Sequence, residues 1–200
     1  IDLVGCDMIK EPIPIRPGMH YAMGGIRTNV DGQTNLPGVY AAGETACVSV
    51  HGGNRLGANS LLDTIVFGER SGNHAAEASR SDDYVEFDVD QALRNEVKRI
   101  QDLLNRPANG DRIAAVRLAM GESMNRNLAV YRNEAGMKET LGDLKEVAKR
   151  YETVPVENKG KIFNTDLIFA LELGFMIDCA TPIAMSALDR KDSRGAQART

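Results

Sequence analysis

One stretch of the chain, residues 34–63, carries the side chains and backbone groups that can do chemistry. It begins with a short apolar run that ends at Glu44 and predicts a buried strand. A long loop dense in glycine and asparagine follows, and it carries His51 and Arg55. The stretch ends at residues 59–63, where the sequence predicts the start of a helix. A strand, a glycine-rich loop and a helix start predict a site whose backbone N–H groups face an acceptor on a ligand.

Each polar side chain of this region also has a purely structural interpretation. A lone arginine in a glycine-rich loop is more often solvated than bound to a ligand, and an acid after a glycine often only ends a strand at the surface. Ser60 can be a capping serine and nothing more. His51 can contact a ligand, but a structural hydrogen bond is the favoured role. Cys47 is either a redox-sensitive thiol or, as we favour, a small buried residue.

Prolines and glycines shape the elements around this stretch. Residues 11–18 contain three prolines, so they predict an extended connector and exclude a helix. Residues 27–34 predict a hairpin, because they contain an Asp-Gly turn signal. Residues 60 to about 80 predict one helix, in which Gly68 and Gly72 let a neighbouring element pack closely. The apolar side of this helix consists of Leu61, Leu62, Ile65 and Val66.

The second half of the chain has the periodicity of amphipathic helices. A polar break at residues 81–83 predicts the boundary between two domains, residues 1–80 and 81–200. From Asp88 onward, apolar residues recur every three or four positions. They predict helices at residues 88–104, from about 111, after a break at 133–136, and at about 164–188. The last of these is apolar on most sides, so we expect it to be the central helix of a small bundle over residues 88–188.

Composition and length exclude several classes of protein. The chain has 200 residues, 42% hydrophobic and 26% charged, with a net charge of −4, which does not fit a basic nucleic-acid binder or a disordered tail. The three cysteines are far apart, which argues against a zinc site or a disulfide framework and favours a reducing compartment. No apolar run reaches the roughly 18 residues that span a bilayer. The abrupt ends, Ile1 and Thr200, predict a part of a longer polypeptide.

Several segments together resemble the flavoprotein subunit of succinate dehydrogenase and fumarate reductase. In the first half they are HYAMGG at residues 20–25, TNLPGVYAAGE at 34–44 and CVSVHGGNRLGANSLLD at 47–63. In the second half they are VYRNE at 130–134, FNTDL at 163–167, ALELG at 170–174 and DSRGA at 192–196. The similarity covers essentially the whole chain. L-aspartate oxidase shares the general plan, but its loop departs from this pattern, and it is the alternative.

This resemblance implies a fold and a set of site residues. The fold is an α/β FAD-binding fragment followed by a mainly α-helical bundle domain, mostly α by residue count. Glu44 is implied as the acceptor for the ribitol hydroxyls of FAD, and Ser60 and Leu61 as the donors of backbone N–H groups to the flavin pyrimidine edge. His20 and Arg55 are implied as ligands of the two carboxylates of a four-carbon dicarboxylate. It implies no catalytic residue and no metal ligand in this chain.

The resemblance also implies an activity and partners. The activity is the interconversion of succinate and fumarate by hydride transfer to or from FAD, with electrons passed to an iron–sulfur subunit of a membrane-anchored complex. It places the protein in the cytoplasm, peripheral on the inner face of the cell membrane through partner subunits. The family's pyrophosphate-binding turn and proton-donating arginine precede the position that matches Ile1. The chain alone should therefore not turn over substrate, and an inactive helical scaffold module is a further alternative.

One departure from the family pattern lies near the end of the chain. Arg194 resembles the arginine of the family's SRGxH segment, whereas Gln197 stands at the usual histidine position. Any role that the family gives to that histidine is therefore in doubt here.

Overall fold

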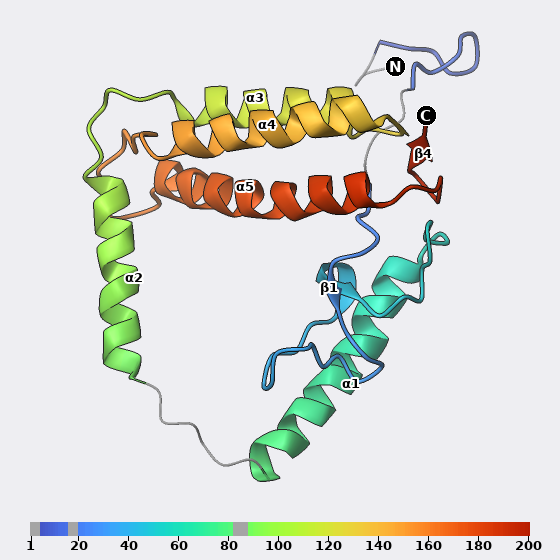
Figure 1. The fold of residues 1–200 in the computed structure, drawn as a ribbon, viewed down its shortest axis with the longest axis horizontal. Helices are drawn as coiled ribbons and strands as arrows, with labels where there is room; N and C mark the ends of the chain where they lie inside the picture. Colours follow the sequence, from blue (N-terminus) through green and yellow to red (C-terminus); the bar gives the residue numbers. More distant parts are fainter. Residues whose placement is uncertain (1–4, 16–19, 82–87) are drawn as a thin grey trace. The chain divides into compact units, whose positions relative to one another are not determined.

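The computed structural model describes residues 5–15, 20–81 and 88–200, and the chain divides into two compact units, residues 1–83 and 84–200 (Figure 1). Residues 82 and 83 of the expected domain boundary and residues 16–18 of the expected connector lie outside the described residues. The described part of the connector, residues 11–15, is neither helix nor strand.

The first unit combines short strands with one long helix. Strand β1 (Ile26–Arg27) pairs in parallel with β2 (Ala46–Cys47), and the 3₁₀ turn η1 (Gly43–Thr45) comes directly before β2. After the glycine-rich loop, helix α1 runs over Asn59–Ser81. The helix predicted from residue 60 to about 80 is therefore confirmed.

The strand predicted to end at Glu44 is wrong. Within it, the structure has one isolated antiparallel bridge, between Gln33 and Tyr40, and then the turn η1. The backbone of Gly43 has φ of 72°, in the left-handed region, which interrupts an extended run and favours glycine. A Cβ at Gly43 would also lie 3.0 Å from Thr64 Oγ1 of α1, so glycine lets η1 pack directly on the helix.

The hairpin predicted at residues 27–34 is only partly present. Its turn forms, because Gly32 N–H donates to the carbonyl of Asn29 at 3.1 Å. Its arms meet through one backbone hydrogen bond, from the N–H of Asn29 to the carbonyl of Gln33 at 3.1 Å, but they form no ladder, since β1 instead pairs with the distant residues 46–47. The turn signal was local and therefore visible in the sequence, whereas the long-range strand pairing was not.

Helix α1 buries a polar face and exposes its apolar one. Asp63 and Ser71 are its buried residues, and Ser71 packs against Gly32. Leu61, in contrast, is 72% exposed, and the other three residues of the predicted apolar side are exposed as well. A Cβ at Gly68 or Gly72 would meet nothing within 4 Å in the described residues. The expectation that these two glycines receive a close neighbour is therefore wrong for the described chain.

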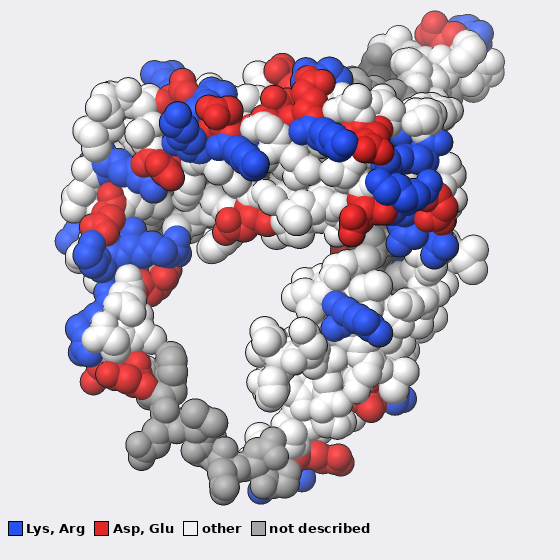
Figure 2. Space-filling view, viewed as in Figure 1, with Lys and Arg blue, Asp and Glu red and all other residues white. Residues whose placement is uncertain are grey.

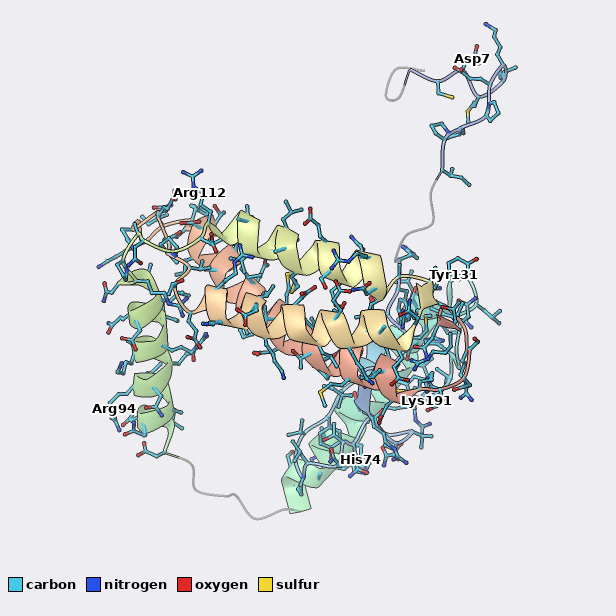
Figure 3. The ribbon with its side chains drawn as sticks, turned by 45° about the horizontal axis from the view of Figure 1, so that its top comes forward. Asp7, His74, Arg94, Arg112, Tyr131 and Lys191 are labelled. Carbon is cyan, nitrogen blue, oxygen red and sulfur yellow. The ribbon has the colours of Figure 1, made fainter. Side chains whose placement is uncertain are left out.

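The second unit is mainly helical. Its elements are α2 (Val89–Leu104), α3 (Ile113–Asn127), β3 (Tyr131–Arg132), α4 (Glu134–Tyr151), α5 (Thr165–Asp189) and β4 (Ala198–Arg199). Side chains of Asp88, Asn133 and Asn164 accept hydrogen bonds from the first turns of α2, α4 and α5 and so fix their starts. Strands β3 and β4 pair in parallel. Figure 3 shows Arg112 at one end of the bundle and Tyr131 and Lys191 at the other.

Three helices, α3, α4 and α5, pack lengthwise around the hydrophobic core of this unit (Figure 1). Large, almost fully buried apolar side chains of this core are Val116, Met137, Leu144, Val154 and Leu173. The expectation that all four helices form the bundle is met only in part. Helix α2 joins it mainly through Leu103, which packs with Val156 and Ala170. The first three turns of α2 expose their apolar residues, because no described element covers them.

Helix α5 is the most apolar element of the chain. It is long and apolar enough to cross a membrane by length and composition, with a mean hydropathy of 1.7 over its best window. One face packs on α3 and α4, and it carries Ala170, Leu173, Ile177, Ala180, Ala184 and Ala187. Large residues on the other face, such as Phe175 and Ile183, are exposed. The expectation of a central helix is therefore wrong for the described residues: α5 is one wall of the bundle.

Charges of both signs are interspersed over the surface of the second unit (Figure 2). Many of them form exposed ion pairs, for example Arg126 with Glu139 at 2.9 Å and Arg150 with Asp111 at 2.7 Å. Exposed pairs of this kind contribute little stability, on the order of 0–1 kcal/mol each. The buried apolar contacts therefore dominate the stability of this unit.

Candidate functional site

A buried carboxylate, Asp63, lies at the centre of the polar groups of the first unit. It is 5% exposed and belongs to the first turns of α1. Its Oδ2 accepts hydrogen bonds from the Tyr21 hydroxyl at 3.1 Å and from His51 Nε2 at 3.0 Å. Because an ionised carboxylate only accepts, His51 donates from Nε2. The structure therefore gives His51 the structural hydrogen bond that the sequence favoured.

The ring of Tyr21 connects Asp63 to Arg55. The Arg55 guanidinium carbon lies 4.7 Å from the centre of the Tyr21 ring, within the range of a cation–π contact. The His51 ring meets the Tyr21 ring edge-on, with 5.6 Å between centroids and planes at 87°. Burial raises the pKa of the Tyr21 phenol, and the hydrogen bond to Asp63 raises it further. The phenol therefore keeps its proton and stays a donor to Asp63.

The guanidinium of Arg55 has one donor that no described residue binds. Its Nη1 donates to the carbonyl of Leu56 at 2.9 Å. Its Nε is buried and has no hydrogen-bond partner in the described parts of the chain. A buried donor without a partner costs about 1–3 kcal/mol, so an acceptor at this point stabilises the site. The edge with Nε and Nη2 is a donor fork that fits a carboxylate.

Glu44 ties the loop before β1 to the turn η1. Its Oε1 accepts a hydrogen bond from the backbone N–H of Ala22 at 3.0 Å, and the side chain is otherwise exposed. This bond brings the segment that holds Tyr21 close to η1. The carboxylate can still accept from a ligand hydroxyl, since each carboxylate oxygen has two acceptor positions.

Ser60 and Leu61 lie in the first turn of α1, where backbone N–H groups have no partner within the helix. The Ser60 carbonyl accepts from Thr64 Oγ1 at 2.9 Å. Such a helix start carries roughly half a positive charge and binds an anionic or electron-rich acceptor. These donors and the Glu44 acceptor are of the chemical types that the pyrimidine edge and the ribitol hydroxyls of a flavin would require. The roles assigned to the three residues remain predictions.

His20 is the one predicted site residue that the structure does not draw into this cluster. It is exposed, and no hydrogen bond or ring contact joins it to another described residue. Its neighbour Tyr21 reaches both Arg55 and Asp63 instead. The role of His20 as a carboxylate ligand therefore stays a prediction.

Sequence reasoning did not single out Tyr21 and Asp63. Both lie within segments that resemble the family, at residues 20–25 and 47–63, but the sequence pattern gives them no role. The signal for Asp63 was an acid directly after two leucines at the start of a helix, on the side that would face the loop. The signal for Tyr21 was weaker, because its partners lie 30 to 42 residues away in the chain.

Other polar groups of the first unit have structural roles. His74, labelled in Figure 3, lies on α1, and its Nδ1 is 2.9 Å from the Tyr40 hydroxyl. This bond fixes the segment before η1 on the helix. Cys47 is a free thiol of intermediate exposure, so it is not the fully buried residue that we favoured. Within the described ranges, no group of three His, Cys, Asp or Glu side chains is placed to hold a metal ion.

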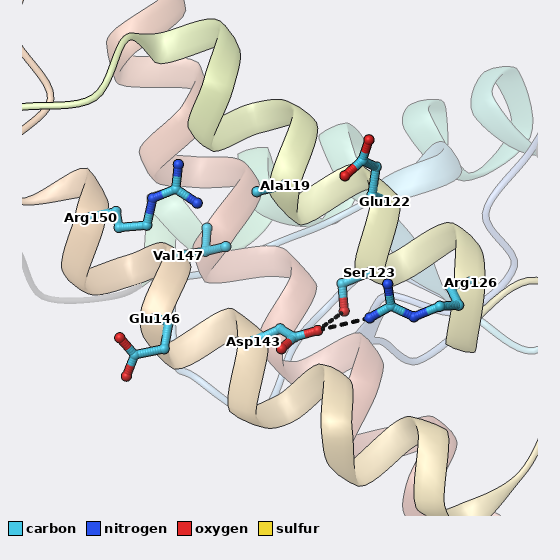
Figure 4. Close-up of a pocket in the computed structure, with 8 residues that line it drawn as sticks. All are labelled: Ala119, Glu122, Ser123, Arg126, Asp143, Glu146, Val147 and Arg150. Atoms are coloured by element: carbon cyan, nitrogen blue, oxygen red, sulfur yellow. Dashed lines mark hydrogen bonds and ion pairs between the residues drawn. The ribbon is translucent and has the colours of Figure 1, made fainter.

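A polar groove lies between α3 and α4 in the second unit, with a volume of about 220 Å³ (Figure 4). Several of its polar groups are bound to other residues of the same unit. Asp143 accepts from Ser123 Oγ at 2.6 Å and from Arg126 at 3.3 Å, and Arg150 pairs with Asp111. None of the predicted site residues lines it.

Gln197 joins the end of the chain to the bundle. It is buried, its Nε2 donates to the carbonyls of Arg190 and Asp192, and its Oε1 accepts from Arg132 at 3.1 Å. Arg194 is exposed and pairs with Asp192. At the position where the family pattern has histidine, this chain therefore has a hydrogen-bonded structural glutamine.

Two family models match the chain. One described as a FAD binding domain matches residues 1–61, and one described as the C-terminal part of the fumarate reductase flavoprotein matches residues 117–200. The first covers the predicted flavin and substrate residues, and the second covers α4, α5 and most of α3.

Relatives and solved structures agree with these matches. The fumarate reductase flavoprotein subunit of Serratia sp. is 40% identical over 98% of this chain and 33% of its own length. The succinate dehydrogenase flavoprotein subunit of Rickettsia conorii is 40% identical over 98% of this chain and 34% of its own length. A mutant quinol fumarate reductase of E. coli superimposes with a TM-score of 0.92 at 38% identity, covering 99% of this chain and 34% of its own. The chain thus spans about a third of the length of these proteins.

Proposed function

We propose that this chain belongs to the family of fumarate reductase and succinate dehydrogenase flavoprotein subunits and forms part of a flavoprotein that interconverts succinate and fumarate. The observation that carries this proposal is the free, partly buried donor edge of Arg55 beside the start of α1. A dicarboxylate is a substrate whose carboxylate completes the hydrogen bonds of that edge.

FAD is the cofactor of this family. The family model described as a FAD binding domain matches residues 1–61, which lie in the first unit. Glu44 would hold the ribitol hydroxyls, and the backbone N–H groups of Ser60 and Leu61 would face the pyrimidine edge. When bound, FAD supplies the centre that accepts or donates hydride. The positive end of α1 favours negative charge at its N-terminus and thus favours the reduced state there.

The side chains of this chain bind and orient the substrate. Arg55 grips one carboxylate with two parallel hydrogen bonds, which fixes the orientation as well as the position of the substrate. His20 contacts the second carboxylate, and the two side chains together polarise the four-carbon chain between them.

The names of the relatives support a larger assembly as part of this proposal. They are flavoprotein subunits, and solved neighbours come from a quinol fumarate reductase and from a Mycobacterium smegmatis Sdh1 complex. For this chain we propose an iron–sulfur partner subunit that takes electrons from the flavin, and a peripheral position on the cytoplasmic face of the membrane through further subunits.

A titration of the complete, FAD-loaded flavoprotein subunit with succinate tests the proposal. Flavin absorbance reports binding, and Arg55→Ala should weaken the affinity about tenfold to a hundredfold, because a charge-assisted bidentate contact is lost. The matched control is Arg70→Ala, which breaks an exposed ion pair with Asp31 in the same unit and should leave the affinity unchanged.

Two results would contradict this function. One is a succinate affinity that Arg55→Ala does not change. The other is a spectral response to L-aspartate that is stronger than the response to succinate, which would favour the aspartate oxidase alternative.

A further inference from the structure

The orientation of Arg55 depends on residues that do not themselves point toward the ligand position. One face of its guanidinium lies on the Tyr21 ring, and Nη1 is bound to the carbonyl of Leu56. These two contacts fix both the plane of the guanidinium and its rotation within that plane. The Nε edge is thereby aimed in one direction before any ligand binds.

The Tyr21 ring is in turn held at its hydroxyl end. Its only hydrogen bond among the described residues goes to Oδ2 of Asp63, at 3.1 Å. The same oxygen holds His51, whose ring packs edge-on against Tyr21. Asp63 therefore fixes the Tyr21 ring twice, once directly and once through His51.

We propose that Asp63 is a positioning residue of the anion site, which acts through Tyr21 to set the direction in which Arg55 presents its free edge to a substrate carboxylate. This inference rests on the proposed function, because it assigns a task to the same site. The task is to give the site a preference for ligands with two carboxylates, because Arg55 binds one of the two.

The burial of Asp63 supports a task beyond stability. A carboxylate this deeply buried is costly unless it is fully paired, and a hydrophobic residue of similar size is often equally stable in its place. Its Oδ1 is buried and lacks a partner within the described chain, so the pairing is incomplete. What the carboxylate provides is a single oxygen, Oδ2, that accepts from both rings at once.

Three substitutions in the complete FAD-loaded subunit separate the contributions of Tyr21 and Asp63 to succinate binding. Tyr21→Phe keeps the ring beneath Arg55 but frees it from Asp63, and Asp63→Ala frees both rings. Asp63→Asn keeps an oxygen that can occupy the Oδ2 position. We expect Tyr21→Phe and Asp63→Ala each to weaken succinate binding about tenfold, the range of a displaced cation–π and carboxylate contact. The Asp63→Asn variant should keep most of the wild-type affinity for succinate.

The coupling between the substitutions distinguishes positioning from independent effects. If Asp63 acts through Tyr21, the double variant Tyr21→Phe/Asp63→Ala should bind succinate no more weakly than Asp63→Ala alone. Additive losses would overturn the proposal. If Asp63→Ala does not fold, Tyr21→Phe decides alone, and an unchanged succinate affinity in that variant overturns the proposal.

A comparison of succinate with butyrate provides a readout that general destabilisation does not move. Butyrate has the same chain length but one carboxylate, so a misdirected Arg55 should lower the preference for succinate over butyrate about tenfold. Equal losses for both ligands would mean that Asp63 is merely structural. Asp31→Ala, an exposed aspartate of the same unit, is the matched control and should leave the preference unchanged.

The two proposals fail in different ways. If Arg55→Ala weakens succinate binding while Tyr21→Phe does not, the positioning role of Asp63 is wrong and the proposed function stands. If Arg55→Ala itself has no effect, the assignment of the site to a dicarboxylate is wrong, and the positioning role falls with it.

Discussion

At the scale of single residues, the geometry of the Arg55 guanidinium matters more than its charge. Arg55→Lys keeps the positive charge but loses the planar fork and most of the contact with the face of Tyr21. We expect the affinity for succinate to fall about tenfold. Flavin absorbance titrations measure this, with Arg70→Lys as the control for the same change in an exposed ion pair. An Arg55→Lys variant with unchanged affinity would show that charge alone suffices.

The sequence draws attention to individual polar residues but not to the contacts between them. Arg55 and His51 stood out because they are the one arginine and the one histidine of a loop dense in glycine. Their common partner Asp63 did not, since a hydrogen bond between Tyr21 and a helix 42 residues later leaves no local pattern. Long-range polar contacts of this kind follow from the fold and are not visible before it.

At the scale of elements, periodicity and caps predicted the helices well. The starts of α2, α4 and α5 lie at the residues after Asp88, Asn133 and Asn164, whose side chains accept from the first turn. Which helices pack together was predicted less well. Helix α2 is amphipathic, as the sequence indicated, but amphipathicity does not say where the apolar side finds its partner.

Two glycines within the bundle helices should respond in opposite ways to the same substitution. Gly174 of α5 faces Tyr151, whose hydroxyl would lie 2.7 Å from an added Cβ, so Gly174→Ala should destabilise the unit by about 1–3 kcal/mol. Gly142 of α4 has nothing within 4 Å, so Gly142→Ala should stabilise it by about 0.5–1 kcal/mol. Denaturant unfolding measures both. A stabilising Gly174→Ala would contradict the close approach of α5 to Tyr151.

The start of α4 and the end of the chain should give this unit a specific pH dependence. The hydrogen bond from Lys138 lowers the pKa of Glu134, and the charges of Lys138, Lys191 and Arg199 lower it further. A carboxyl with a lowered pKa contributes stability above its unfolded value, and this contribution is lost as pH falls through the folded value. Thermal unfolding of Glu134→Gln should therefore be less sensitive to pH on the acid side of the ordinary glutamate range.

The control for this pH dependence lies on the same helix. Glu146 of α4 makes no ion pair with a described residue, so Glu146→Gln should keep the wild-type pH profile. Equal acid profiles for wild type and Glu134→Gln would mean that this exposed network contributes nothing measurable, as many surface pairs do.

At the scale of the whole molecule, the two units differ in how much apolar surface they bury. In the described residues of the first unit, Ala41 is the only buried apolar side chain, whereas the second unit has a continuous core that includes Val116, Met137, Leu144 and Leu173. Composition alone did not reveal this difference, because the first unit also carries many apolar residues, such as those on α1, and leaves them exposed.

This difference predicts which unit folds by itself. Residues 84–200 expressed alone should give a helical circular dichroism spectrum and one cooperative thermal transition, because their core is complete within the unit. Residues 1–83 expressed alone should show no cooperative transition, because burial of a few polar groups and one alanine cannot offset the conformational entropy of ordering the chain. A cooperative transition of residues 1–83 without cofactor would contradict this account. If adding FAD alone produced one, the donors at the start of α1 and Glu44 would bind the flavin tightly enough to order the whole unit.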